Sequence, residues 1–233
     1  SCGSSPTEAS SLLTADIRGG MDKPGLLGLG DEIKGVTFVP LEVTTDDASL
    51  IDGVYDYAVT DRYIYVLPVK EPRIVLFDRQ GRFIRTLVKE GQGPGEFRGI
   101  LPCIQVDERN DRLFLFSNNR VWEYTLEGEF IGQSTHEYSV IYMRHIGKDR
   151  FAAISFPFQP FNGGGFGLGL FSRKGDTIAI KNDFYSFLLP HEKSGFTTSI
   201  APAYSDAQNS VLFKTGSNDT VFCISADRIS AAC

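Results

Sequence analysis

Histidines and carboxylates are the side chains in this chain that could carry acid–base or metal chemistry. The three histidines are His136, His145 and His191, and none has a second histidine or a carboxylate at a metal-binding spacing. The sequence therefore predicts no metal site and no cofactor. His145 lies in a strand-like segment, YMRHIG, where it could face a channel, although a hydrogen-bonded structural role is favoured. There is no Gly-x-Ser-x-Gly elbow and no evident Ser-His-Asp triad, so a hydrolase is not predicted.

Carboxylates are plentiful, but the most regular ones recur in a fixed setting. Asp61, Asp111 and Asp149 each precede an arginine and then a strand-like run that opens on an aromatic or aliphatic residue. Repetition of one pair at one position favours a turn or salt-bridge role over a catalytic acid and base.

Two glycine-rich stretches could in principle cradle a phosphate. One is GQGPGEF at 91–97, and the other is GLLGLG at 25–30. A phosphate loop requires a helix directly after it, and neither stretch is followed by a helical pattern. We interpret the first as a sharp connection between strands, in which glycines supply positive φ angles and Pro94 fixes a turn, and the second as a flexible segment.

The four cysteines, Cys2, Cys103, Cys223 and Cys233, have no CxxC spacing and predict no zinc or redox motif. Cys103 and Cys223 lie in apolar runs and are expected to be buried free thiols, with a disulfide between them as the alternative.

Composition indicates an all-β globular protein. Among 233 residues, 42% are hydrophobic, and 18 Phe, 9 Tyr, 24 Gly and 11 Pro suit short strands joined by turns. The formal charge is −6 with no basic run, so nucleic acid is not an expected partner. No apolar run approaches the roughly 18 residues of a membrane-spanning helix.

A repeat of two parts organises the chain after residue 34. The first part is two strands around a polar turn, at 55–68, 103–117, 142–156 and, more weakly, 203–215. The second part is a hairpin, at 73–87, 120–134, 167–181 and 220–233. The hairpin glycines Gly81, Gly128 and Gly175 recur at a constant interval of 47 residues, within the range of propeller blades.

Each repeat would form one four-stranded antiparallel sheet, which cannot bury both apolar faces alone. Stacking such sheets radially gives a β-propeller, and we expect about four blades, at about 53–98, 99–140, 141–190 and 196–233. Residues 1–33 are predicted to be a flexible tether, 34–233 the propeller domain, and 35–44 an extra strand with Pro40 suited to an edge.

The segment IVLFDRQGRFIRTLVKEGQGPGEF at 74–97 resembles the repeat of NHL-type propellers. The whole layout is similar to the six-bladed β-propeller lipoproteins of Bacteroides and their relatives, which begin with a Cys-led polar arm and a strand of the VTFVPLEVT kind. The resemblance covers roughly residues 35–233 and implies fold more than function.

Four blades instead of six is a departure from that family. Residues 36–44 could pair with the fourth unit to close a small ring. The favoured interpretation is a shortened member, with an incomplete ring whose exposed blade face could drive self-association.

The start, Ser1-Cys2-Gly3-Ser4, resembles the junction left by a bacterial lipoprotein signal. This implies a lipid on Cys2, membrane contact only through that lipid, and a periplasmic or outer-membrane-anchored location in the cell envelope. The alternative is an arbitrary boundary at Cys2.

Propellers bind ligands through loops at one end of their channel, so we predict a non-catalytic binding or interaction module for a protein or glycan ligand. The candidate ligand-binding residues are Lys70, Arg73, Arg98, Asn118, Asn119, Arg120, Arg144, His145, Phe158 and Phe161. The alternative is a lyase or lactonase on the same scaffold, in which His145, Arg144 and Asp56 would face the channel. A purely structural remnant is the third hypothesis.

Overall fold

The computed structural model describes residues 35–99, 103–117, 119–137, 140, 142–154, 167–181, 203–205, 209–213 and 220–231. The chain divides into a unit at Ser1–Phe38 and a unit at Val39–Cys233, and the account below concerns the second unit. The predicted tether at 1–33 lies outside the described residues.

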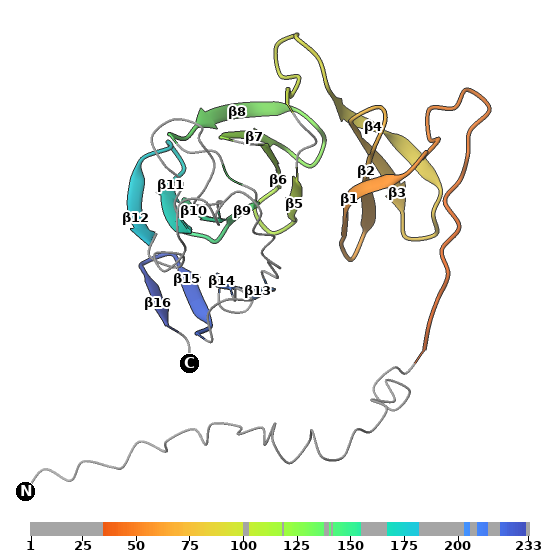
Figure 1. The fold of residues 1–233 in the computed structure, drawn as a ribbon. Helices are drawn as coiled ribbons and strands as arrows, with labels where there is room; N and C mark the ends of the chain where they lie inside the picture. The colour runs from red at the N-terminus through yellow and green to blue at the C-terminus, as the bar shows by residue number, and fades with distance from the viewer. Residues whose placement is uncertain are drawn as a thin grey trace, which may run out of the picture. The chain divides into compact units, whose positions relative to one another are not determined.

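The described residues form sixteen strands in four antiparallel sheets, each of which we call a blade (Figure 1). Blade 1 contains β1 Val54–Val59, β2 Tyr63–Pro68, β3 Arg73–Asp78 and β4 Phe83–Lys89. Blade 2 contains β5 Cys103–Asp107, β6 Arg112–Ser117, β7 Arg120–Tyr124 and β8 Phe130–Thr135. Blade 3 contains β9 Tyr142–His145, β10 Arg150–Ile154, β11 Leu168–Ser172 and β12 Thr177–Lys181. Blade 4 contains β13 Ala203–Ser205, β14 Ser210–Phe213, β15 Phe222–Ser225 and β16 Ile229–Ala231.

In every blade the strands are neighbours in chain order, so each blade is a simple up-and-down meander. This confirms the four-stranded blades that the repeat predicts. The described residues contain no helix, and hence none of the length and apolar character that a membrane crossing would need.

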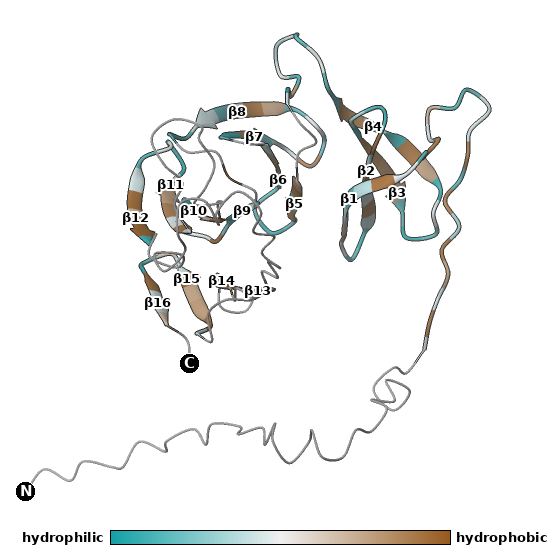
Figure 2. Cartoon of the chain, in the orientation of Figure 1, coloured by the Kyte–Doolittle hydropathy of each residue, from teal (hydrophilic) through white to brown (hydrophobic). Residues whose placement is uncertain are grey.

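Apolar side chains fill the spaces between consecutive blades, which we call seams. The cluster at seam 1/2 joins Leu76 and Val88 of blade 1 to Leu113, Trp122 and others of blade 2. Corresponding clusters join blade 2 to blade 3 and blade 3 to blade 4. Figure 2 shows hydrophobic colour concentrated on the strands and hydrophilic colour on the turns. Each inner blade thus buries both faces, which is the arrangement of a β-propeller.

The hairpin glycines have the positive φ angles expected of them. Gly128 has φ 88°, and a Cβ there would lie 2.9 Å from the carbonyl oxygen of Leu87 in the preceding blade. Gly175 has φ 101° and meets the carbonyl of Thr135 in the same way. Any side chain at these turns would therefore strain the backbone and collide with the neighbouring outer strand.

The extra strand predicted at 35–44 does not form, and this prediction is wrong. The segment makes one backbone hydrogen bond to blade 1, in which the Glu42 N–H donates to the Gly81 carbonyl at 2.8 Å. The Glu42 carboxylate also accepts the Phe83 N–H at 2.8 Å. Pro40 has no N–H to donate, so a continuous ladder is not possible there. These contacts go to blade 1 and not to the fourth unit.

The GQGPGEF connection is closed by its own side chains. The Glu96 carboxylate accepts the Gly93 N–H at 2.8 Å, and the Gly91 N–H donates to the Phe97 carbonyl at 3.1 Å. Phe97 is fully buried at seam 1/2, edge-on to Trp122. The chain continues into strand β5 and not into a helix, which supports the connection over a phosphate loop.

Candidate functional site

The predicted loop residues Lys70 and Arg73 hold a neighbouring segment in place. An Arg73 Nη donates to the Leu50 carbonyl at 2.7 Å and another contacts Glu71, while Lys70 forms an ion pair with Asp52 at 3.7 Å. Contacts of this kind anchor a loop and leave little of Arg73 for a ligand.

Arg98 and Arg120 lie at the same pocket. They line a pocket of about 440 Å³ with Glu96, Trp122 and others. The Arg98 guanidinium donates to the carbonyls of Gly91 and Gln92, so it also braces the GQGPGEF connection. Asn119 donates from Nδ2 to the His136 carbonyl at 3.2 Å, which indicates a structural role.

The three residues of the enzyme hypothesis do not assemble into one centre. The His145 ring stacks on Phe114 with a centroid separation of 5.0 Å, and burial lowers its pKa. The Asp56 carboxylate accepts the backbone N–H of Ile104 at 2.8 Å and so ties β1 to β5. Arg144 precedes His145 on β9, so the two side chains leave opposite faces of the sheet.

Four predicted residues, Cys2, Asn118, Phe158 and Phe161, lie outside the described residues. Cys103 and Cys223 are free, so the disulfide alternative is wrong. Burial, with a smaller contribution from Asp56, raises the pKa of the Cys103 thiol to about 11, which makes it a poor nucleophile at neutral pH. Within the described ranges, no three His, Cys, Asp or Glu side chains come together as a metal site would require.

On the face of blade 1 where Leu41 and Ile51 pack against Val66, Val75 and Phe77, the edge strand β1 remains exposed. Tyr57 and Val59 on β1 expose 63% and 52% of their surface, an unusual degree for such residues on a strand. No described contact tests self-association through this face, and it stays a prediction.

A further cavity lies at seam 2/3, and no residue of the predicted set lines it. We call it the seam groove. It has a volume of about 750 Å³. Its lining comes from β7 and β8 of blade 2, and from the β9–β10 turn, β10, and the β11–β12 hairpin of blade 3. The polar lining residues are Glu123, Gln133, Ser134, Thr135, Asp149, Arg150, Ser172, Arg173, Lys174 and Asp176.

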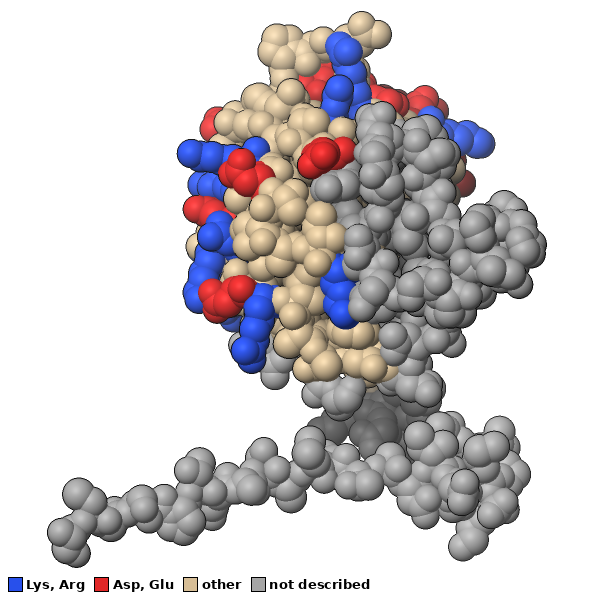
Figure 3. Space-filling view, turned by 60° about the vertical axis from the view of Figure 1, so that its left-hand side comes forward, with Lys and Arg blue, Asp and Glu red and all other residues tan. Residues whose placement is uncertain are grey.

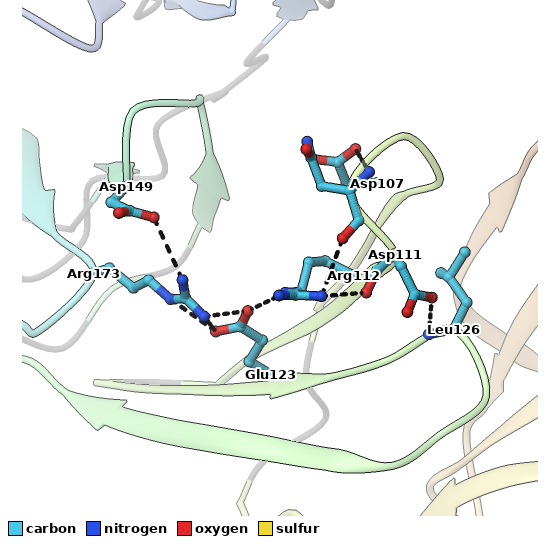
Figure 4. Close-up of polar contacts among 8 residues, drawn as sticks. Asp107, Asp111, Arg112, Glu123, Leu126, Asp149 and Arg173 are labelled. Atoms are coloured by element: carbon cyan, nitrogen blue, oxygen red, sulfur yellow. Dashed lines mark hydrogen bonds and ion pairs between the residues drawn. The ribbon is translucent and has the colours of Figure 1, made fainter.

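A buried carboxylate ties the two blades together at this groove (Figure 4). Glu123 on β7 is 6% exposed and accepts from Arg112 Nε at 2.7 Å and from Arg173 Nε at 2.9 Å. Arg173 comes from blade 3 and also lies 3.5 Å from Asp149. Burial lowers the pKa of Arg173, but hydrogen bonds and charge from Glu123 and Asp149 outweigh this and raise it, so the guanidinium stays charged.

The repeat shows that Glu123 is an exception. Strand registers place it at the position of Leu76 in blade 1, Leu170 in blade 3 and Cys223 in blade 4. The residue paired with it on the outer strand is Gly132, where blade 1 has Arg85 and blade 3 has Ala179. The hairpin of blade 3 that faces blade 2 carries Arg173 and Lys174. The equivalent positions in the hairpin of blade 2 that faces blade 1 are Leu126 and Glu127.

These replacements open the groove. At seam 1/2 the equivalent cavity is about 370 Å³, is lined by Leu76 and Leu126, and is crossed by an ion pair between Arg85 and Glu127. At seam 2/3 the crossing side chain is absent because its position is Gly132. A Cβ added to Gly132 would have no atom within 4 Å, and its φ is not positive, so the backbone does not require glycine there.

Sequence reasoning missed this site, although a signal was present. Aligning the hairpins on Gly81 and Gly128 sets LFDRQGRFIR above EYTLEGEFIG, which places Glu123 under Leu76 and Gly132 under Arg85. Figure 3 shows a face on which Lys and Arg side chains are interspersed with Asp and Glu.

Comparison with known proteins supports the fold. Residues 12–233 match the family described as "Domain of unknown function (DUF4934)". No curated protein matches the chain.

Three solved structures illustrate the likeness in fold. A Bacteroides fragilis NCTC 9343 protein described as inferred to be exported has a TM-score of 0.62 at 19% identity, over 82% of this chain and 53% of that one. A DUF4221 family member from Bacteroides vulgatus has a TM-score of 0.53 at 10% identity, over 78% and 57%. The β-propeller domain of Swd1 from Myceliophteria thermophila has a TM-score of 0.50 at 12% identity, over 74% and 52%. The chain thus spans about half the length of the solved structures it matches.

Proposed function

The chain belongs to the DUF4934 family, and from that premise we propose that it is a non-catalytic binding module of the bacterial cell envelope whose ligand occupies the seam groove. The β-propeller fold supports binding as the general role, because the scaffold is rigid and presents concave sites at its seams and loops. The finer assignment to the NHL-like six-bladed lipoproteins, with a lipid on Cys2, is part of this proposal.

An extracytoplasmic location is supported by the Bacteroides fragilis structure, whose description refers to export. The likeness is one of fold at 19% identity, so the location is carried to this chain as part of the proposal.

One observation carries the choice of the seam groove. Between blades 1 and 2 this seam position holds a cavity of about 370 Å³ crossed by the Arg85–Glu127 ion pair, whereas between blades 2 and 3 it holds a groove of about 750 Å³ that no side chain at position 132 crosses. The change involves residues on both sides of the seam, with Glu123 and Gly132 facing Arg173 and Lys174. A repeat unit that departs from its neighbours at several facing positions, at a cost in apolar packing, is where a function is expected.

The test is a binding screen with a soluble glycan and peptide library on the folded chain and on Gly132→Arg. The substitution restores the arginine that crosses the equivalent seam of blade 1, and the backbone at Gly132 leaves open space around the new Cβ. We expect wild type to retain one or more ligands and Gly132→Arg to lose them while keeping its melting temperature. A ligand that binds both proteins equally, or no ligand for wild type, would contradict the proposal.

A further inference from the structure

The ion pair that closes seam 1/2 indicates what is missing from the seam groove. In that pair, Arg85 on the outer strand of blade 1 meets Glu127 on the hairpin of blade 2. In the seam groove the position of Arg85 is vacated by Gly132, and the position of Glu127 is taken by Lys174. The charge on the hairpin side is reversed, and the outer strand offers no side chain to meet it. The space beside Gly132 therefore faces a cation where the other seam places an internal pair.

The cationic side chains of the groove differ in whether they already pair with a carboxylate. Arg173 is held by Glu123 and Asp149. Lys174 forms no ion pair with any residue in the described part of the chain, and the one described bond of the Arg150 side chain goes to the Asp149 carbonyl. An anionic group entering beside Gly132 would thus find the Lys174 ammonium, with Arg150 in the same lining.

The rest of the lining suits hydroxyl groups. Ser134 occupies the register position of Val88 in blade 1, so an apolar side chain is replaced by a hydroxyl. Across the groove, Ser172 and Asp176 are joined by a hydrogen bond of 2.8 Å, and Asp149 keeps an exposed carboxylate. Carboxylate oxygens accept hydrogen bonds from ligand hydroxyls, and a serine hydroxyl both donates and accepts.

These features favour a saccharide over a peptide. A peptide with many carboxylates would place them against Asp149 and Asp176, and like charges at close range exclude a partner. A sugar acid carries few carboxylates among many hydroxyls. This composition matches a groove that offers the Lys174 ammonium to a carboxylate and several oxygen acceptors to hydroxyls. The volume of about 750 Å³ is in the range of pockets for small ligands.

We infer that the seam groove binds an acidic saccharide whose carboxylate pairs with Lys174 in the space that the Arg85 side chain fills in the preceding blade. The inference rests on the proposed function, because it names the ligand class of the same site. It assigns Lys174 to the carboxylate, and Ser134, Asp149 and Asp176 to the hydroxyls.

The experiment is isothermal titration of the chain with trigalacturonic acid and with the same trisaccharide after reduction of its carboxylates to hydroxymethyl groups. We expect the acid to bind at least about tenfold more tightly than the reduced form, as loss of a charged hydrogen bond implies. The difference should shrink as salt is raised, because the pair is open to solvent.

Three variants make the test specific to the groove. Lys174→Gln should weaken the acid about tenfold and leave the reduced form unchanged. Gly132→Glu should abolish binding of the acid, since the new carboxylate lies where the ligand's would be and pairs with Lys174. The matched control is Lys148→Gln, because Lys148 is paired with Asp227 at seam 3/4 and does not line the groove. It should bind as wild type does.

The outcomes distinguish a wrong ligand class from a wrong binding site. Equal affinity for the acid and its reduced form overturns the acidic saccharide as the ligand, and so does a preference for hexaglutamate over both. In either case, loss of ligand binding in Gly132→Arg still supports the groove as the binding site. Binding of the acid that survives in both Gly132→Glu and Gly132→Arg overturns the groove itself. Thermal melts of every variant show whether a lost signal reflects the site or the fold.

Discussion

The Glu123 carboxylate of blade 2 accepts hydrogen bonds from the Arg173 guanidinium of blade 3, at a strand position where the other blades carry Leu76, Leu170 or Cys223. An apolar cluster packs at this seam as at seam 1/2, but here the buried Glu123 takes a position that is occupied by Leu76 at seam 1/2. A buried carboxylate is tolerable only while its partners remain, and Arg112 and Arg173 are those partners.

Replacing Glu123 alone should therefore destabilise the chain. Glu123→Leu leaves two guanidiniums without their carboxylate, and we expect a loss of about 2–4 kcal/mol, below the full cost of a buried pair because Arg173 is 38% exposed. The double variant Glu123→Leu with Arg173→Leu reproduces the apolar pairing of Leu76 and Leu126 and should recover most of that loss. Urea unfolding of both single variants and the double gives the coupling energy. Additive losses would contradict the pairing.

Two glycines of the chain should respond in opposite ways to alanine. A Cβ on Gly91 would lie 1.9 Å from a carboxylate oxygen of Glu96, so Gly91→Ala must displace the side chain that closes the GQGPGEF connection. We expect a cost of about 1–3 kcal/mol from the lost hydrogen bond to Gly93 and the disturbed loop. Gly132→Ala is the matched control, with no atom within 4 Å, and should be neutral or slightly stabilising. Thermal melts of the two variants provide the comparison.

Phe97 should be a large contributor to stability even though it belongs to a connection and not to a strand. Its side chain is fully buried in the seam 1/2 cluster, edge-on to Trp122 at a centroid separation of 6.4 Å. Phe97→Ala should cost about 3–5 kcal/mol, and Phe97→Leu should cost clearly less because it leaves a smaller cavity. Denaturant unfolding measures both. Equal effects of the two substitutions would mean that the cavity is not the cause.

Stability should fall in mild acid because of His136. The side chain is 2% exposed between Phe151 and Phe171, and its ring nitrogens have no hydrogen-bond partner within the described ranges. Burial lowers its pKa from 6.5 to about 4. The unfolded chain therefore binds a proton more readily than the folded chain between these values. The stabilisation is complete above pH 6.5 and is lost as pH falls toward 4.

The expected loss from this residue between pH 7.5 and pH 4.5 is roughly 2–3 kcal/mol. Carboxylates also begin to titrate in this range, so the measurement is the difference between wild type and His136→Leu. Urea unfolding at both pH values should show a smaller loss for the variant. Parallel loss in the two proteins would mean that His136 does not titrate with a lowered pKa.

The strands and turns could be predicted from the sequence because their causes are local. An alternating apolar run and a turn with Gly81, Gly128 or Gly175 are contained within about fifteen residues, and the backbone needs nothing distant to adopt them. The face-to-face stacking of blades followed from the same pattern, since a four-stranded sheet with two apolar faces must cover both.

The segment at 35–44 shows where local pattern is insufficient. Its composition is that of a strand, but a strand exists only when a neighbour supplies a ladder of hydrogen bonds. The segment receives one backbone bond at Gly81, and its own Glu42 carboxylate accepts the Phe83 N–H, so it stays irregular.

By itself, the sequence determined the all-β class, the four blades and the turn glycines, because those depend on residues close together in the chain. The tertiary structure alone decided that Arg98 and Arg120 line one pocket, that the His145 ring stacks on Phe114, and that Gly132 and Lys174 line one groove. Those relationships join residues on different blades, and they arise from the register of each strand and the packing of one sheet on the next, which set side chains about forty residues apart at a single seam.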